Sequence, residues 1–186
     1  MKKRTWIVLL SFLLLTGCGA KPQEPDTGGG TELGTETETG TESEKEDAAV
    51  SMYDLRVAME GADTGFPSML NASSVEENAE ENFKYISKDL DYSKIESFFV
   101  SYSEDGEYAD EIVVIVMKDR ADMKEAEACL KKHRENRYKL YEQYQPREMK
   151  RVEDGLAFTS GRYAVLIISD NRDAVKKAFE QVVNGN

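Results

Sequence analysis

The chain has 186 residues and a formal net charge of −12, and residues 48–186 hold 27 acidic and 19 basic side chains. This excess of acids repels phosphate backbones and anionic lipid headgroups, so it argues against nucleic acid as a partner and against electrostatic membrane binding. Only one of the two cysteines, Cys129, falls in this part of the chain, which excludes a fold stapled by internal disulfides.

The N-terminus has the pattern of an export signal. The basic residues Lys2, Lys3 and Arg4 precede the apolar run Trp6–Leu15. As a helix this run is roughly 15 Å long, about half the hydrocarbon thickness of a bilayer. It is therefore too short for a transmembrane anchor, the alternative interpretation, and suits the apolar region of a signal peptide.

Leu15-Thr-Gly-Cys18 resembles the lipobox of bacterial lipoproteins. The resemblance implies a signal peptide over residues 1–17, cleavage before Cys18, and lipidation of Cys18 by diacylglycerol and fatty acyl chains such as palmitate. Two or more acyl chains on one residue exceed what stable anchoring needs. We therefore expect a lipid-anchored protein on the extracytoplasmic face of the cell membrane.

Residues 18–47 comprise Cys18 and an acidic segment rich in Gly, Thr and Glu. Residues 19–47 contain nine acids against two lysines, and Leu33 is their one large apolar residue. Such a composition cannot bury enough surface to offset the entropy of ordering, so a disordered linker is expected. Its predicted role is a spacer between membrane and domain; a metal-scavenging acidic tail is the alternative.

Residues 48–186 are expected to form a single domain. Apolar residues at helical spacing, alternation and turn signals predict its elements. The expected helices are 48–62, a short one over 74–85, 122–144 and 170–185, and the expected strands are 94–102, 109–117, 151–158 and 162–169.

The strands come in pairs without a crossover helix inside either pair, which favours hairpins over a parallel sheet. The fold class predicted is therefore α+β, an antiparallel sheet of about four strands with helices packed on one face, in the order α-β-β-α-β-β-α. The strand 109–117 contains a continuous β-branched run, which is typical of a central strand.

Two acids, Asp110 and Glu111, stand at the start of that strand. A carboxylate buried beside an apolar strand needs a cation or a hydrogen-bond donor as its partner. The structural interpretation is a partly buried ion pair with a base of the long helix, such as Arg134 or Arg137. The functional interpretation is a ligand-binding or acid/base carboxylate with a raised pKa. The candidate ligand-binding residues are therefore Asp110, Glu111, Arg134 and Arg137.

Other chemistry has less support in the sequence. The single histidine, His133, has only Cys129 at helical spacing, and two ligands do not make a zinc site. The tyrosines, Tyr163 among them, could line a groove for a sugar or peptide, although such stripes more often belong to a core. We expect no catalytic residue, no metal and no cofactor.

Three segments carry a further resemblance: Tyr108–Ile115 with its Ala-Asp-Glu-Ile element, the long helix ending at Tyr144-Gln-Pro146, and Gly161–Asp170. Together they resemble a domain-of-unknown-function family found in lipoproteins of Firmicutes, largely clostridial, over roughly residues 50–184. The resemblance implies a lipid-anchored extracytoplasmic protein and implies no activity.

The leading functional hypothesis is a non-enzymatic binding or interaction module at the cell envelope, with an envelope protein or a cell-wall polymer as partner and the membrane reached through the lipid. One alternative is an enzyme acting on cell-wall or extracellular polymer through Glu111 or Asp110. The other is a small solute-binding lipoprotein, although about one domain of chain is short for a two-lobed clamshell.

Overall fold

The computed structural model describes residues 50–185. The predicted signal peptide, the lipidation site Cys18 and the acidic linker therefore lie outside the described residues. Within 50–185, no helix combines the length and apolar character needed to cross a membrane.

The described chain alternates helices with short runs of strands. Its helices are α1 (Met52–Gly61), α2 (Ala79–Phe83), α3 (Met123–Tyr144), α4 (Met149–Glu153) and α5 (Arg172–Asn184). Its strands are β1 (Met69–Ser73), β2 (Ile95–Ser103), β3 (Glu111–Met117), β4 (Leu156–Ser160) and β5 (Tyr163–Ile168). Short 3₁₀ turns cover Tyr92–Lys94, Arg120–Asp122 and Pro146–Glu148.

Local sequence signals explain several of these boundaries. The Ser51 side chain accepts a hydrogen bond from the Asp54 amide at 3.3 Å and caps the start of α1. Pro146 follows the last turn of α3, where its ring and missing N–H stop the helix. Gly185 has a φ of 68° at the end of α5, the left-handed conformation that commonly terminates helices.

The strands form one antiparallel sheet in the order β1-β2-β3-β5-β4. Both β3 and β5 are buried along their whole length. Since successive side chains of a strand point to opposite faces, a strand buried throughout needs cover on both sides.

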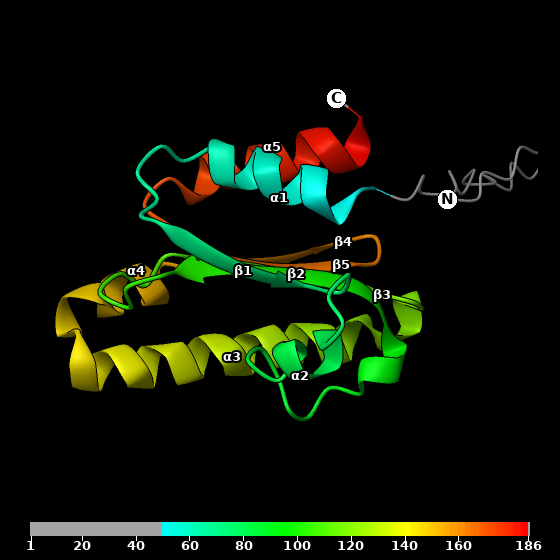
Figure 1. Ribbon diagram of the computed structural model, residues 1–186, viewed down its shortest axis with the longest axis horizontal. Helices are drawn as coiled ribbons and strands as arrows, with labels where there is room; N and C mark the ends of the chain where they lie inside the picture. Colours follow the sequence, from blue (N-terminus) through cyan, green and yellow to red (C-terminus); the bar gives the residue numbers. More distant parts are fainter. Residues whose placement is uncertain (1–49, 186) are drawn as a thin grey trace, which may run out of the picture. The chain divides into compact units, whose positions relative to one another are not determined.

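Helices supply that cover on both faces of the sheet (Figure 1). On one face, Val113, Ile115 and Met117 of β3 pack into a core with residues of α2, α3 and α4. On the other, Ile112 and Val114 pack with α1 and α5. The domain is thus a three-layer sandwich in which β3 contributes to two separate cores.

The α+β class and the antiparallel sheet expected from the sequence are confirmed. The structure differs in having a fifth strand, β1, at the sheet edge, and in placing helices on both faces rather than one. After the 3₁₀ turn Pro146–Glu148, helix α4 occupies the first residues of the predicted strand 151–158, so that β4 starts only at Leu156.

Candidate functional site

Glu111 is the first residue of β3, and its side chain points to the face covered by α3. It is fully buried. One carboxylate oxygen is hydrogen-bonded to His133 Nε2. The other lies 2.7 Å from Arg137 Nε and accepts a hydrogen bond from the Tyr85 hydroxyl at 3.2 Å. The carboxylate is therefore held by two side chains of α3 and by Tyr85 from the turn after α2.

The charges of this cluster compensate one another. Burial by itself raises the pKa of Glu111, but the contacts with His133, Arg137 and Tyr85 outweigh it and hold the pKa below its usual value. Burial, followed by the Glu111 charge, raises the pKa of the Tyr85 hydroxyl. Glu111 is thus an ionised carboxylate enclosed by its own domain.

The Arg137 side chain, 12% exposed, forms an ion pair with Glu111 rather than a well-formed hydrogen bond, because its Nε–H is not aimed at the carboxylate. Its Nη2 instead donates to the Tyr141 hydroxyl at 3.1 Å, and that hydroxyl donates to the Tyr108 carbonyl at 2.6 Å. The network therefore fastens α3 both to β3 and to the loop before it.

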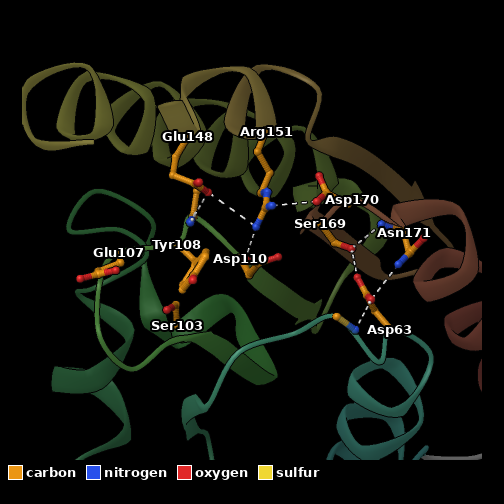
Figure 2. Close-up of polar contacts among 12 residues, drawn as sticks. Asp63, Ser103, Glu107, Tyr108, Asp110, Glu148, Arg151, Ser169, Asp170 and Asn171 are labelled. Atoms are coloured by element: carbon orange, nitrogen blue, oxygen red, sulfur yellow. Dashed lines mark hydrogen bonds and ion pairs between the residues drawn. The ribbon is translucent and has the colours of Figure 1, made fainter. Parts of the chain in front are cut away.

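Asp110 belongs to a second polar network at the same end of the sheet (Figure 2). It is buried, and Arg151 of α4 donates a hydrogen bond to it. Arg151 also donates to Asp170 at 2.7 Å and lies 3.6 Å from Glu148, whose carboxylate accepts from the Ala109 amide at 3.1 Å. One guanidinium is thus shared by three carboxylates.

This imbalance alters the titration of Asp110. Burial is the largest cause, and with the nearby charges of Asp170 and Glu148 it outweighs the favourable contact with Arg151, raising the pKa of Asp110 to about 6. A raised carboxyl pKa was the functional alternative for this residue. In the structure it arises from a tight internal network that already occupies the carboxylate.

A third group of contacts, around Asp63, was missed by the sequence reasoning. Asp63 follows α1 and is buried. It accepts hydrogen bonds from the Ser169 hydroxyl at 2.5 Å, the Asn171 side chain at 2.8 Å and the Gly65 amide at 2.8 Å (Figure 2). Burial raises the pKa of Asp63, but these hydrogen bonds lower it further than burial raises it.

The Asp63 contacts join segments more than a hundred residues apart, tying the end of α1 to the β5–α5 connection. Ser169 also accepts from the Asn171 amide at 2.9 Å. The Ser-Asp-Asn sequence over 169–171 is a recognisable helix-start signal, but nothing local indicates that its partner is Asp63. The role of this cluster is to hold the layer of α1 and α5 on the sheet.

Arg134 lies apart from these networks, at a groove between α3 and β4. The groove has a volume of about 780 Å³, within the usual range of ligand sites. Arg134 Nη1 donates a hydrogen bond to the Gly155 carbonyl at 2.7 Å where β4 begins. The lining consists of Lys124, Glu127, Ala128, Leu130, Lys131 and Arg134 from α3, and Asp154 to Thr159 from the other side.

Small residues on β4 create this groove. Ala157 and Thr159 point to the α3 side and are exposed, while Phe158 points to the opposite face and packs on Phe179 at a ring distance of 5.3 Å. Gly155 is tightly enclosed, since a Cβ there would lie 3.0 Å from the Val152 carbonyl oxygen. The edge strand therefore has a large apolar residue on one face and an open surface on the other.

Tyr163 does not join the other candidate residues. It is buried in the core formed with α1 and α5, where its ring lies 5.6 Å from that of Phe179. That core is on the opposite face of the sheet from Glu111. The structure therefore brings Glu111 and Arg137 together, pairs Asp110 with Arg151, and places Arg134 and Tyr163 in two further, separate environments.

The pair Cys129 and His133 forms no metal centre in the structure. His133 is committed to Glu111, and burial raises the pKa of the Cys129 thiol. Between residues 50 and 185, no group of three or more His, Cys, Asp or Glu side chains is arranged to hold a metal ion.

Comparison with known proteins identifies the sheet and the α3 layer as a family domain. A family model described as a domain of unknown function, DUF4358, matches residues 69–169, which is more than half of the chain. No curated protein and no solved structure gives a significant match. The matched range runs from the start of β1 to just past the end of β5, and so contains both Glu111 and the groove. The chain belongs to the DUF4358 family of domains of unknown function.

Proposed function

We propose that this protein is a lipoprotein anchored through Cys18 on the extracytoplasmic face of the membrane, and that its DUF4358 domain is a non-enzymatic binding module at the cell envelope. The anchor is supported by the basic start, the short apolar run and the lipobox-like Leu15–Cys18. The Firmicute lipoprotein family noted above fits the same interpretation.

The observation that carries the binding role is the open groove of about 780 Å³ between α3 and β4. Its lining combines small and apolar groups with three bases, Lys124, Lys131 and Arg134, and two acids, Glu127 and Asp154. The acids that would serve an enzyme, Glu111 and Asp110, are instead buried and engaged by Arg137 and Arg151. A general acid or base has to reach its substrate, so the groove supports binding better than the carboxylates support catalysis.

The anchor is tested by replacing Cys18 with alanine. Without the thiol no diacylglycerol can be attached, so the protein should leave the membrane fraction almost completely or accumulate with its signal peptide uncleaved. Cell fractionation and mass spectrometry of the N-terminus measure both outcomes. Cys129→Ala is the matched control and should leave retention unchanged. Normal cleavage with full membrane retention in Cys18→Ala would refute the anchor.

The binding role is tested by a photoreactive amino acid at Thr159, on the floor of the groove, in the full-length protein in its own membranes. A binding module should give a cross-linked adduct from this position. The same group at Lys177, which is exposed on α5 across the sheet, is the control. Equal adduct yields from both positions, or none from Thr159, would contradict a binding role for the groove.

A further inference from the structure

We infer that the groove between α3 and β4 takes an extended, acidic segment of a partner polypeptide, which adds to the open edge of β4 as a further strand. This inference rests on the binding-module proposal and names the kind of partner that its groove fits. It draws on three features: the free edge of the sheet, the space beside it and the charge of the α3 wall.

The first feature is the free edge. β4 pairs with β5 alone and ends the sheet order, so along residues 50–185 no strand pairs with its outer side. Unpaired backbone N–H and C=O groups on an edge are a template for another strand. Strand addition to such an edge is a recurring way of binding extended peptides, with backbone hydrogen bonds giving affinity and alternate side chains giving specificity.

The second feature is the space above this edge. Ala157 and Thr159 are exposed and small, so the α3 side of β4 is open instead of being filled by its own side chains. In an added strand, every second side chain would point to the same side as Ala157 and Thr159. Those side chains would enter the groove and meet α3.

The third feature is the charge of the wall they would meet. Lys124, Lys131 and Arg134 of α3 line the groove, and they span about 15 Å along the helix. Alternate residues of a strand are about 6.7 Å apart, so three side chains at alternate positions would cover about 13 Å and lie along the same stretch of α3. Acidic side chains at such positions would be attracted to the bases of this wall.

The two lysines of this wall are available, whereas Arg134 already donates a hydrogen bond to the Gly155 carbonyl. Over the described residues, neither Lys124 nor Lys131 takes part in an ion pair, and both are exposed. Of the two acids in the lining, Asp154 is paired with Lys150 at 2.9 Å, and Glu127 is exposed on α3 between Lys124 and Lys131. With three bases against these two acids, the lining keeps a small positive charge. Since the region 48–186 carries a net charge of −8, an acidic partner would be repelled by most of its surface and attracted here, which favours this one docking position.

The test measures fluorescence anisotropy of a short labelled peptide of alternating valine and glutamate added to the full chain in detergent. Binding is expected, and Lys131→Glu should weaken it roughly tenfold by reversing one charge of the wall. Lys177→Glu makes the same charge change on the exposed face of α5 and should leave the affinity unchanged. Lys131 is exposed, so its variant should fold, and urea unfolding checks this.

Two further peptides separate strand addition from simple charge attraction. A valine–lysine peptide should not bind, and a valine–glutamate peptide with all its backbone amides methylated, which lacks the backbone donors, should lose its affinity. Equal binding of the methylated peptide, or equal competition by an inorganic polyphosphate, would overturn the inference and indicate a polyanion as the partner.

The outcomes also separate this inference from the binding role itself. If no peptide binds while the photoreactive group at Thr159 still gives its specific adduct in membranes, the peptide assignment is wrong and the binding module stands. If that adduct is missing, the groove has no partner and both proposals fail.

Discussion

Replacing Glu111 with alanine should lower the free energy of unfolding by about 3–5 kcal/mol, the usual cost of breaking a buried ion pair by removing one partner. His133, which is buried, and Arg137, which is 12% exposed, would remain on the same face of α3 without the carboxylate that holds them. Because total stabilities are about 5–15 kcal/mol, this one change should remove a large share of the stability of the domain. Urea unfolding followed by circular dichroism measures it.

Two variants make this prediction specific. Glu111→Gln keeps an acceptor for the Tyr85 hydroxyl and for His133 but loses the charge facing Arg137, so it should cost less than Glu111→Ala. Glu142→Ala removes an exposed glutamate elsewhere on α3 and should change stability by no more than about 0.5 kcal/mol. A loss from Glu111→Ala as small as that from Glu142→Ala would show that the network contributes little.

The sequence predicted the central elements because their patterns are long and consistent. The apolar run of β3 and the helical spacing over 122–144 leave few alternatives, and the observed α3 begins and ends within about a residue of the expected range. The strand after Gly161, expected over 162–169 and observed as β5, was equally clear. Periodicity is most informative in segments of this length.

Short elements were not predictable in the same way. β1 is a five-residue edge strand, Met69–Ser73, whose side chains lack a clear alternation, and the sequence after it had suggested a helix from Ser74. Its register is fixed by pairing with β2, as in Ala72 opposite Val100. α4 is also five residues long, and in so short a stretch Val152 fits a buried helix position as well as a strand.

The sequence also predicted that the two acids need partners, but it identified the partner of only one. The ion-pair interpretation is correct for Glu111, which forms an ion pair with Arg137 of the long helix. Arg134 instead donates a hydrogen bond to the Gly155 carbonyl. Asp110 forms its ion pair with Arg151 of α4, a helix that was not predicted from the sequence. Asp110 lies just before β3 and Glu111 begins it, and which cation meets each carboxylate depends on tertiary packing.

The remaining difference is that helices cover both faces of the sheet, where the sequence analysis expected them on one. The continuous apolar run of β3 indicated a central strand, and a strand buried on both sides requires two covering layers. The apolar stripe of α5, with Val175 and Phe179, provides the second layer together with α1. The groove could not have been predicted, because it depends on how α3 packs beside the small residues Ala157 and Thr159 of β4, which are distant from α3 in the sequence.

Asp110 should make the stability of the domain fall as the pH rises from about 4 to about 6. Its pKa is near 3.8 when unfolded and about 6 in the folded protein. Between these values the folded state keeps a proton that the unfolded state has released, so the free energy of unfolding decreases with increasing pH. Taken in full, this shift corresponds to about 3 kcal/mol.

Other groups act in the opposite direction, so the effect has to be isolated by difference. The pKa values of Glu111 and Asp63 are lowered in the folded state, and their contribution is therefore lost as the pH falls. Asp110→Asn keeps an oxygen for Arg151 and cannot ionise. The stability of the wild type minus that of Asp110→Asn should therefore drop by up to about 3 kcal/mol between pH 4 and pH 7.

An acid with the opposite shift provides the control for this measurement. Lys150 lowers the pKa of Asp154, so the wild type minus Asp154→Asn difference should rise with pH where the Asp110→Asn difference falls. Urea unfolding at a series of pH values gives both curves. A flat curve for Asp110→Asn would mean that Arg151 fully compensates the burial of Asp110, so that this carboxylate stays ionised in the folded domain at mildly acidic pH.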